Sequence, residues 1–185
     1  MKATYVALSA LLTMGIAGNA SAATIYWTNW TSDTVGLTTG SAQGTLSPPS
    51  GPITVTYSGN VASETNINNT YPSWLPSATY TGGDIGNAPP AGDIIAQNGG
   101  ANTGVNTITF SQPINDPVMA IWSLGSPSIV TQYVFPSNEV VNIEGGGRSN
   151  EYGGSSIFLV SGANAITGDE GNGVIEFIGN YSSIT

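Results

Sequence analysis

The sequence predicts an all-β protein, an antiparallel β-sandwich of jelly-roll type. Thr, Val, Ile and aromatic residues recur in short runs between Gly, Pro, Asn and Ser, which is the composition of strands and turns. No segment keeps an apolar period of 3.6 residues over three helical turns. The number of runs, about ten, is typical of sandwich and jelly-roll folds.

The first 22 residues have the pattern of a secretory signal peptide. Lys2 supplies the positive start, Ala3–Ala17 is mostly apolar, and Ala20-Ser21-Ala22 matches the small-residue cleavage pattern. The apolar stretch is shorter than the ~20 residues of a transmembrane helix. We therefore expect cleavage after Ala22, no membrane insertion after cleavage, and one secreted domain over residues 23–185.

The expected strands share β-branched or aromatic residues and a boundary of Gly, Pro, Asn or Ser. In chain order they are Thr24–Trp30, Ile53–Ser58, Ala78–Thr81, Thr107–Ser111, Pro117–Leu124, Ile129–Phe135, Val140–Ile143, Ser156–Val160, Gly173–Ile178 and Tyr181–Thr185. Long loops are expected at Val61–Ser77 and Gly82–Gly104, and loops of that length are usually functional or mobile.

Hydrophobic patterning distinguishes the central strands from those with one exposed face. Val118–Trp122 and Ile157–Val160 are apolar at successive positions, so we expect both to be covered on both faces. Ile53–Tyr57 alternates apolar residues with threonine. Its apolar residues should therefore face the core and its threonines the solvent.

Charge and composition exclude several classes of function. The chain has 2 basic and 11 acidic residues, no His and no Cys. Without His or Cys it has no Ser-His-Asp triad, no cysteine nucleophile, no disulfide and no ordinary zinc, haem or iron–sulfur site. After cleavage Arg148 is the only basic residue against 11 acidic ones, a net charge of −10. Nucleic-acid binding needs clustered Lys and Arg, so we do not expect it.

An acidic turn at Gly168–Gly173 is a candidate calcium site. Asp169, Glu170 and Asn172 offer carboxylate and amide oxygens on a glycine frame, and calcium prefers such oxygen ligands. Asp84 or Asp93 could join them from the long loop. The alternative is a tight hairpin turn, with the loop carboxylates simply solvated.

Three aromatic residues are candidates for carbohydrate binding. Tyr71, Trp74 and Tyr80 lie in or near a proline-containing loop, and exposed rings can stack on the apolar faces of sugars. The alternative is that Trp74 folds back and fills the end of the sandwich, since large aromatic residues are usually buried.

Glycoside hydrolysis would need two carboxylates about 5–10 Å apart in a cleft. Glu144, Glu151 and Glu176 are the candidates. Because 11 acidic residues make many pairs by chance, this pattern is weak evidence for catalysis. No catalytic residue is assigned.

Two C-terminal segments, Asp116–Gly125 and Ser149–Ser156 continued through Gly171–Thr185, resemble secreted bacterial proteins of the PEP-CTERM, exosortase-sorted group. The resemblance covers Asp116–Thr185. It implies a secreted β-rich body from a biofilm-forming Gram-negative bacterium that produces exopolysaccharide. The chain lacks the Pro-Glu-Pro motif, apolar helix and basic end of that group's sorting tail.

Since the chain stops in the expected strand Tyr181–Thr185, it is either truncated or a member released freely. Loss of a following strand would leave an open sheet edge, so self-association is expected. The sequence as a whole favours a secreted, non-catalytic protein of the extracellular matrix or cell surface that contacts polysaccharide. The alternative is a carboxylate-dependent glycoside hydrolase or lyase on the same scaffold.

Overall fold

The computed structural model describes residues 22–67, 73–99 and 104–185, and the backbone of residues 3–11. The described chain is built almost entirely of antiparallel strands, which confirms the all-β, sandwich-like fold class. The jelly-roll arrangement stays a prediction. No helix in the described part of the chain is long and apolar enough to cross a membrane.

The described residues form fifteen strands and one short 3₁₀ helix. They are β1 (Ala3–Leu11), β2 (Ile25–Trp27), β3 (Asn29–Thr34), β4 (Gly36–Leu46), β5 (Ile53–Val61), η1 (Ser77–Tyr80), β6 (Ile95–Asn98), β7 (Thr107–Asn115), β8 (Val118–Leu124), β9 (Thr131–Val134), β10 (Val140–Gly146), β11 (Ser155–Ser156), β12 (Phe158–Leu159), β13 (Ala165–Gly168), β14 (Gly171–Ile178) and β15 (Asn180–Ile184).

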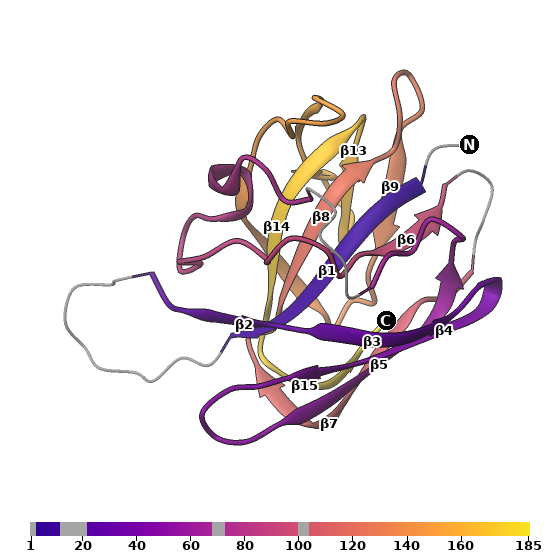
Figure 1. Cartoon of the computed structure of the whole chain (residues 1–185). Coiled ribbons are helices and arrows are strands. Elements are labelled where there is room, and N and C mark those ends of the chain that lie inside the picture. The colour runs from indigo at the N-terminus through magenta and orange to yellow at the C-terminus, as the bar shows by residue number, and fades with distance from the viewer. Residues whose placement is uncertain (1–2, 12–21, 68–72, 100–103) are drawn as a thin grey trace.

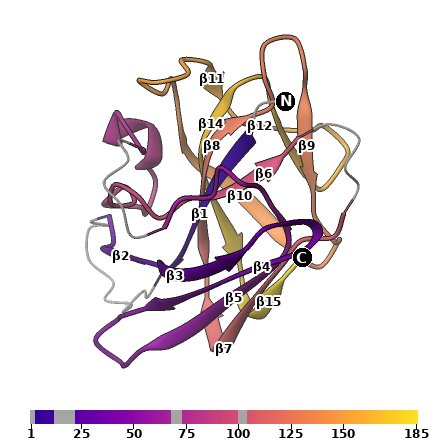
Figure 2. The same cartoon turned by 45° about the vertical axis from the view of Figure 1, so that its right-hand side comes forward.

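The strands form three sheets (Figures 1 and 2). The main sheet has seven strands in the order β10-β14-β8-β1-β2, with β6 also paired to β1 and β11 to β14. The second sheet has the order β15-β7-β5-β4-β3, and the small sheet has the order β12-β13-β9. All pairs are antiparallel except β11 with β14.

The principal core lies between the main and second sheets. The second sheet contributes apolar side chains from all five of its strands, and β6, β8, β10 and β14 contribute from the main sheet. Its large members include Trp30, Leu46, Tyr57, Phe110, Ile121, Phe177 and Tyr181.

A second apolar cluster covers the opposite, outer face of the main sheet. Alternate residues of β8, among them Val118 and Trp122, face this cluster, whereas Met119 and Ile121 face the principal core. The long segment between β5 and β6 supplies the cover, including Trp74 and residues of η1. Both faces of the main sheet are therefore packed, as Val118–Trp122 predicted.

The expected alternation in Ile53–Tyr57 is confirmed, with apolar residues buried and Thr54 and Thr56 exposed. The expected strand Ala78–Thr81 is wrong, because Ser77–Tyr80 forms η1. Burial of Ile157–Val160 on both faces is also wrong. Phe158 and Leu159 are 54% and 50% exposed, since β12 is an edge strand of the small sheet.

Strands β4, β6 and β13 were not expected from the sequence. Strand β4 has few β-branched aliphatic residues, but pairing with β3 on one side and β5 on the other makes it a strand. Its Gly44 lies so close to Thr28 and to the backbone of Asn29 that a Cβ atom would clash with both. Tertiary pairing thus overrides weak local propensity here.

Strand β1 comes from the segment that we predict to be a signal peptide. It pairs with β8 along one edge, and with β6 and β2 along the other. Cleavage after Ala22, which stays a prediction, would remove a central strand from the main sheet.

Candidate functional site

The candidate site is a cavity of about 610 Å³ at one end of the sandwich. Strands β5 and β7 of the second sheet, β6, β8 and β14 of the main sheet, and β9 with the segment that follows it all contribute to its walls. Ligand pockets in proteins typically have volumes of ~300–1,000 Å³. The cavity therefore has the size of a small-molecule site.

Buried apolar side chains of the principal core form part of the wall. They come from four different strands and from the segment after β9, and are Ile108, Met119, Phe135, Phe177 and Ile184. Phe135 packs edge-on against Phe177, with ring centroids 5.3 Å apart. It also lies parallel to Tyr133 at 6.5 Å. The wall thus presents aromatic surface on a rigid support.

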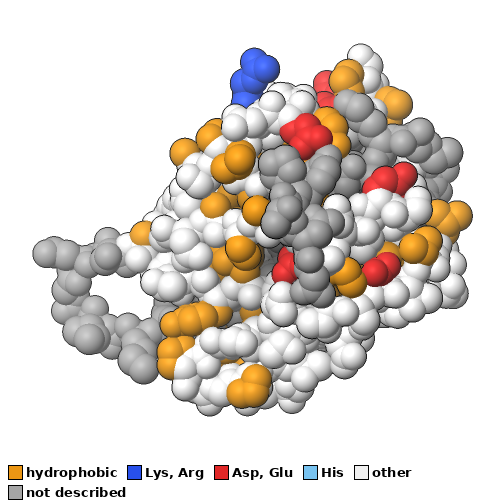
Figure 3. All heavy atoms as spheres, in the orientation of Figure 1, with side chains coloured by type: hydrophobic (Ala, Val, Ile, Leu, Met, Phe, Trp, Pro, Cys, Tyr) orange, Lys and Arg blue, Asp and Glu red, His pale blue; other side chains and the backbone are white. Residues whose placement is uncertain are grey.

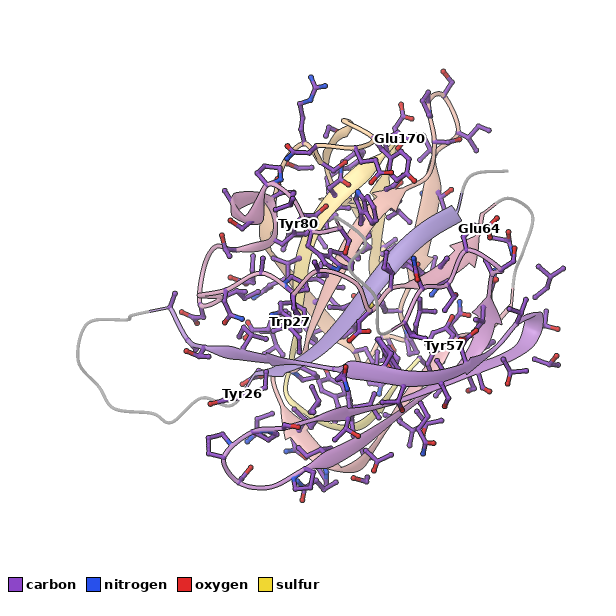
Figure 4. All side chains as sticks on the ribbon, viewed as in Figure 1. Tyr26, Trp27, Tyr57, Glu64, Tyr80 and Glu170 are labelled. Carbon is purple, nitrogen blue, oxygen red and sulfur yellow. The ribbon has the colours of Figure 1, made fainter. Side chains whose placement is uncertain are left out.

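A hydrogen-bonded group of side chains from β5 and the start of β7 forms the polar wall. The Tyr57 hydroxyl lies 2.9 Å from the carbonyl oxygen of Asn60 and 2.8 Å from Asn106 Oδ1 (Figure 4 labels Tyr57). Asn106 Oδ1 also accepts a bond from the Asn60 backbone N–H at 2.8 Å. Gly59, with φ +142°, leaves the space that Asn106 Oδ1 occupies. These bonds fix the orientation of the Asn106 amide.

Gln97 of β6 is the most informative polar residue of the wall. It is only 6% exposed, and its Oε1 accepts a hydrogen bond of 2.7 Å from the Tyr133 hydroxyl. Its amide nitrogen has no hydrogen-bond partner in the described part of the chain. Gln97 lines the cavity, and its amide nitrogen is not fully buried. Gln97 therefore offers an oriented N–H group to a ligand.

Both tyrosines of the cavity remain protonated hydroxyl donors. Burial raises the pKa of Tyr57 well above its usual range. Burial also raises the pKa of Tyr133, and the proximity of Tyr57 adds to the increase. Neither phenol ionises near neutral pH, so neither brings charge to the cavity.

No Asp, Glu, Lys or Arg side chain is among the described residues that line the cavity. Its polar lining comes from amides, hydroxyls and backbone groups, the amides being Asn60, Gln97, Asn98, Asn106 and Gln132. Figure 3 shows only scattered charged side chains on the face that it presents. The site is therefore suited to an uncharged ligand with several hydrogen-bonding groups.

The aromatic residues singled out in the sequence lie elsewhere. Tyr71 is outside the described residues. Trp74 is 1% exposed and Tyr80 is fully buried, and they pack edge to face at 5.2 Å on the outer face of the main sheet (Tyr80 is labelled in Figure 4). Stacking on a sugar needs an accessible ring face, which Trp74 and Tyr80 lack in this structure. Trp74 takes the alternative, core position.

Two residues of the candidate calcium site, Glu170 and Asn172, bond to Ser123, whereas Asp169 bonds to Ser128. Asp169 is exposed and accepts a bond from the Ser128 N–H. Glu170 is buried and accepts a 2.7 Å bond from the Ser123 hydroxyl (Figure 4 labels Glu170). Asn172 is buried, and its Oδ1 accepts a bond from the Ser123 N–H. The oxygens of this turn thus bond to the protein.

No group of three or more acidic residues in the described ranges could hold a metal ion. Ser123 and Glu170 both have positive φ, at 61° and 57°. Asn172 also donates to the carbonyl oxygens of Gly153 and Glu170. Asp169 and Glu170 connect β13 to β14, and the side chains of this connection bond to other parts of the protein.

The candidate catalytic carboxylates do not lie at the cavity. Glu176 is on β14 between Ile175 and Phe177, which face the principal core, so Glu176 faces the outer side. Its pKa is raised to about 7 by burial first, and then by the carboxylates of Glu144, Asp116 and Asp84. Glu151 is exposed in a turn. Asp93, with φ 47°, lies in the long segment before β6.

Sequence reasoning missed the residues that form the cavity. Asn60, Gln97, Asn98 and Asn106 look like ordinary loop or strand-end amides in the sequence. The one available signal was Tyr57, an aromatic residue at an inward position of an alternating strand. These residues line one cavity because strands of all three sheets contribute to its walls.

The chain matches no family model, no curated protein and no solved structure. The geometry of the cavity is therefore the basis on which we infer a function.

Proposed function

We propose that this chain is a secreted, non-catalytic binding protein of the extracellular matrix or cell surface, whose cavity takes an uncharged segment of polysaccharide. The observation that carries the proposal is the cavity of about 610 Å³ with an aromatic wall, an amide wall and no charged lining side chain among the described residues. In this proposal the sheets hold the lining residues in place, and the lining residues determine which ligand binds.

Aromatic and amide groups together match the surface of a sugar ring. A sugar has apolar C–H faces that pack on aromatic rings and hydroxyls that both donate and accept hydrogen bonds. The Gln97 amide nitrogen is a donor without a partner in the described chain, and the Asn106 amide is held by Tyr57 and Asn60. A small number of oriented polar groups on an apolar wall is the usual composition of a specific pocket.

Charge favours a neutral sugar over an acidic one. The chain has a formal net charge of −9, so a uronate or sulfated sugar is repelled at long range. The described cavity lining offers no Lys or Arg side chain to pair with an acid. A neutral hexose segment is not repelled by the net charge and needs no Lys or Arg partner in the cavity.

The hydrolase alternative has less support. Glycoside hydrolysis needs two carboxylates flanking the scissile bond, and the described lining has none. Glu176 and its acidic neighbours belong to the outer side of the main sheet.

The cellular location in this proposal rests on the sequence. The segment Met1–Ala22 has the features of a secretory signal peptide. The resemblance of Asp116–Thr185 to PEP-CTERM proteins associates the chain with exopolysaccharide-producing Gram-negative bacteria. The location and the neutral-glycan ligand are separate claims, and each has its own test.

Calorimetric titration with neutral and uronate-containing oligosaccharides of equal length tests the ligand. We expect saturable binding of a neutral oligosaccharide only. Gln97→Met keeps the volume and removes the donor, so affinity should fall ~3- to 10-fold, the loss expected for one neutral hydrogen bond. Gln43→Met is the matched control, because Gln43 is exposed on β4.

Equal affinity in the Gln97 and Gln43 variants would place binding elsewhere on the molecule. Binding of the uronate series as strongly as the neutral series would contradict the electrostatic argument. Absence of binding by every neutral oligosaccharide at millimolar concentration would reject the proposed function.

A further inference from the structure

A strand slot in the main sheet is the feature that carries a further inference. Strand β1 lies between β8 on one edge and β6 and β2 on the other, and its register is defined on both edges. Tyr5–Ser9 lie opposite Trp122–Val118, and Ala3–Val6 lie opposite Asn98–Ile95. The strand thus enters the middle of a sheet whose two faces are both covered by apolar clusters.

The strands around the slot are held by contacts that do not involve β1. Strand β8 pairs with β14 along its other edge. Strand β6 is held by residues 60–66: the Ala62 N–H donates to the Ala96 carbonyl, and the Ala96 N–H donates to Thr65 Oγ1. Since N–H and C=O groups alternate between the two edges of a strand, Ile95 and Gln97 direct theirs toward β1.

Strand β2 is anchored in the same independent way, beginning at the predicted cleavage point. The Ala23 N–H donates to the Asp84 carbonyl, and the Gly86 N–H donates to the Ala23 carbonyl. Asn87 bonds both backbone groups of Ile25 through its side-chain amide. A chain that begins at Ala23 therefore keeps β2 in place.

Removal of β1 would leave a gap one strand wide between anchored walls. With β1 in place all seven residues of β8 are buried, and removal of β1 would leave the backbone groups along that edge of β8 without their strand partner. An edge of this kind is a template for adding a strand by main-chain hydrogen bonds.

We propose that, after signal-peptide removal, the gap between β8 and β6/β2 is a strand-acceptor site for an extended apolar peptide segment. The inference rests on the predicted cleavage and is independent of the proposed sugar ligand. The occupant runs antiparallel to β8, and its chemistry is that of Ala3–Leu11, the segment seated there in the uncut chain. Apolar residues stand opposite Met119 and Ile121, and a small residue stands opposite Ala120.

Specificity follows from the register. Val6 and Leu8 are opposite Ile121 and Met119, which face the principal core. Ala7 is opposite Ala120, which belongs to the outer cluster. A strand shifted by one residue would exchange these two faces. The site therefore selects which alternate positions of the peptide are apolar, as well as the overall composition of the peptide.

The test uses the full chain with a site for a specific protease inserted between Leu11 and Ala22. The folded protein is cut and then mixed with an excess of labelled synthetic peptide of sequence Ala3–Leu11. We expect the labelled peptide to replace the cut strand at one per chain. The amides of β8 that are protected from hydrogen exchange in the uncut chain should remain protected.

The matched control is the same peptide with Val6→Pro and Ala7→Pro. Adjacent N–H groups point to opposite edges, so one of the two prolines removes a donor that faces β8. Proline inside a central strand loses a ladder bond and disturbs pairing, and we expect binding ~100-fold weaker than for the unchanged peptide.

Equal binding of the two peptides, or protection by the peptide only at strands other than β8, β6 and β2, would overturn the proposal. So would a cut chain that stays folded and takes up neither peptide, or one that dimerises without competition from the peptide. If the cut chain unfolds when its strand leaves, refolding with the unchanged peptide alone supports the site. Refolding with both peptides or with neither rejects it.

Discussion

Replacing Glu176 by Gln should stabilise the protein, and more so as pH rises. Glu176 is 8% exposed, and its carboxylate has no hydrogen bond to the described part of the chain. Burial, followed by the charges of Glu144, Asp116 and Asp84, raises its pKa from 4.5 to about 7. The folded protein therefore binds this proton more tightly than the unfolded chain does. The contribution of Glu176 to stability falls as pH rises from about 4.5 through about 7.

The size of the effect follows from the shift in pKa. If the whole increase acted on folding, ionised Glu176 would cost about 3 kcal/mol above pH 7. The carboxylate keeps some contact with solvent, which screens it, so we expect about 1–2 kcal/mol. Glu176→Gln should thus be more stable than the wild type by that amount at pH 8. Near pH 4.5 the two proteins should be about equally stable, since Glu176 is then protonated in the folded state.

Urea unfolding of the full chain at pH 4.5, 6, 7 and 8, at constant ionic strength, measures the difference between variant and wild type. The difference is the useful quantity, because burial also raises the pKa of Glu139 and gives both proteins a pH dependence of the same sign. Glu64→Gln is the matched control, since Glu64 is exposed. A difference between wild type and Glu176→Gln that does not change with pH, or an equal change in Glu64→Gln, would refute the reasoning.

Four further predictions concern other parts of the molecule. N-terminal sequencing of protein exported by its native host should begin at Ala23; an intact Met1 would contradict the predicted cleavage. Asn172→Ala should lower the unfolding free energy by about 2–4 kcal/mol, because Asn172 joins Ser123, Gly153 and Glu170. The predicted calcium site is tested by melting with calcium against sodium at matched ionic strength; a gain that is lost in Asp169→Asn/Glu170→Gln would support the site, and no gain would reject it. Sedimentation should show concentration-dependent association through the edge strand β15, and a monomer at all concentrations would exclude it.

The strands with the clearest side-chain pattern were predictable from the sequence. The alternation of Ile53–Tyr57 directly reports one buried and one solvated face. The continuous apolar run Val118–Trp122 reports a strand covered on both sides. In both segments the order of apolar and polar side chains matches the faces that are buried in the folded protein.

Elements stabilised by distant partners were not predictable. The run Ile157–Val160 looks like a buried strand, but Phe158 and Leu159 lie in an edge strand of the small sheet. The run around Ala78–Thr81 forms η1 instead, and Tyr80 of η1 packs edge-on against Trp74. The hydrophobic periodicity of a single segment does not show the order of strands in a sheet or the path of a long loop.

The candidate site was hidden for the same reason. Its polar wall is made of amides, which carry no motif, and Gln97 lies in a stretch expected to be a loop. Gln97 acquires its role from two neighbours far along the chain, since Tyr133 holds its Oε1 and β1 fixes its backbone. Composition says which side-chain types the chain has, but it could not place neutral residues from distant segments around one cavity.

The position of Gln97 also predicts that the cavity and the strand slot are coupled. Gln97 lines the cavity through its side chain, and its backbone lies opposite Thr4 of β1. An empty slot leaves β6 paired only with residues 60–66, so the Gln97 amide is less firmly oriented and a ligand must bear the cost of ordering it. Linkage requires that a strand in the slot raise affinity for the sugar by the same factor as the sugar raises affinity for the strand. Titrating the cut chain with a neutral oligosaccharide, with and without the Ala3–Leu11 peptide, measures that factor, which we expect to exceed ~5-fold. Identical sugar affinities in the two titrations would show that β6 is rigid without its β1 partner.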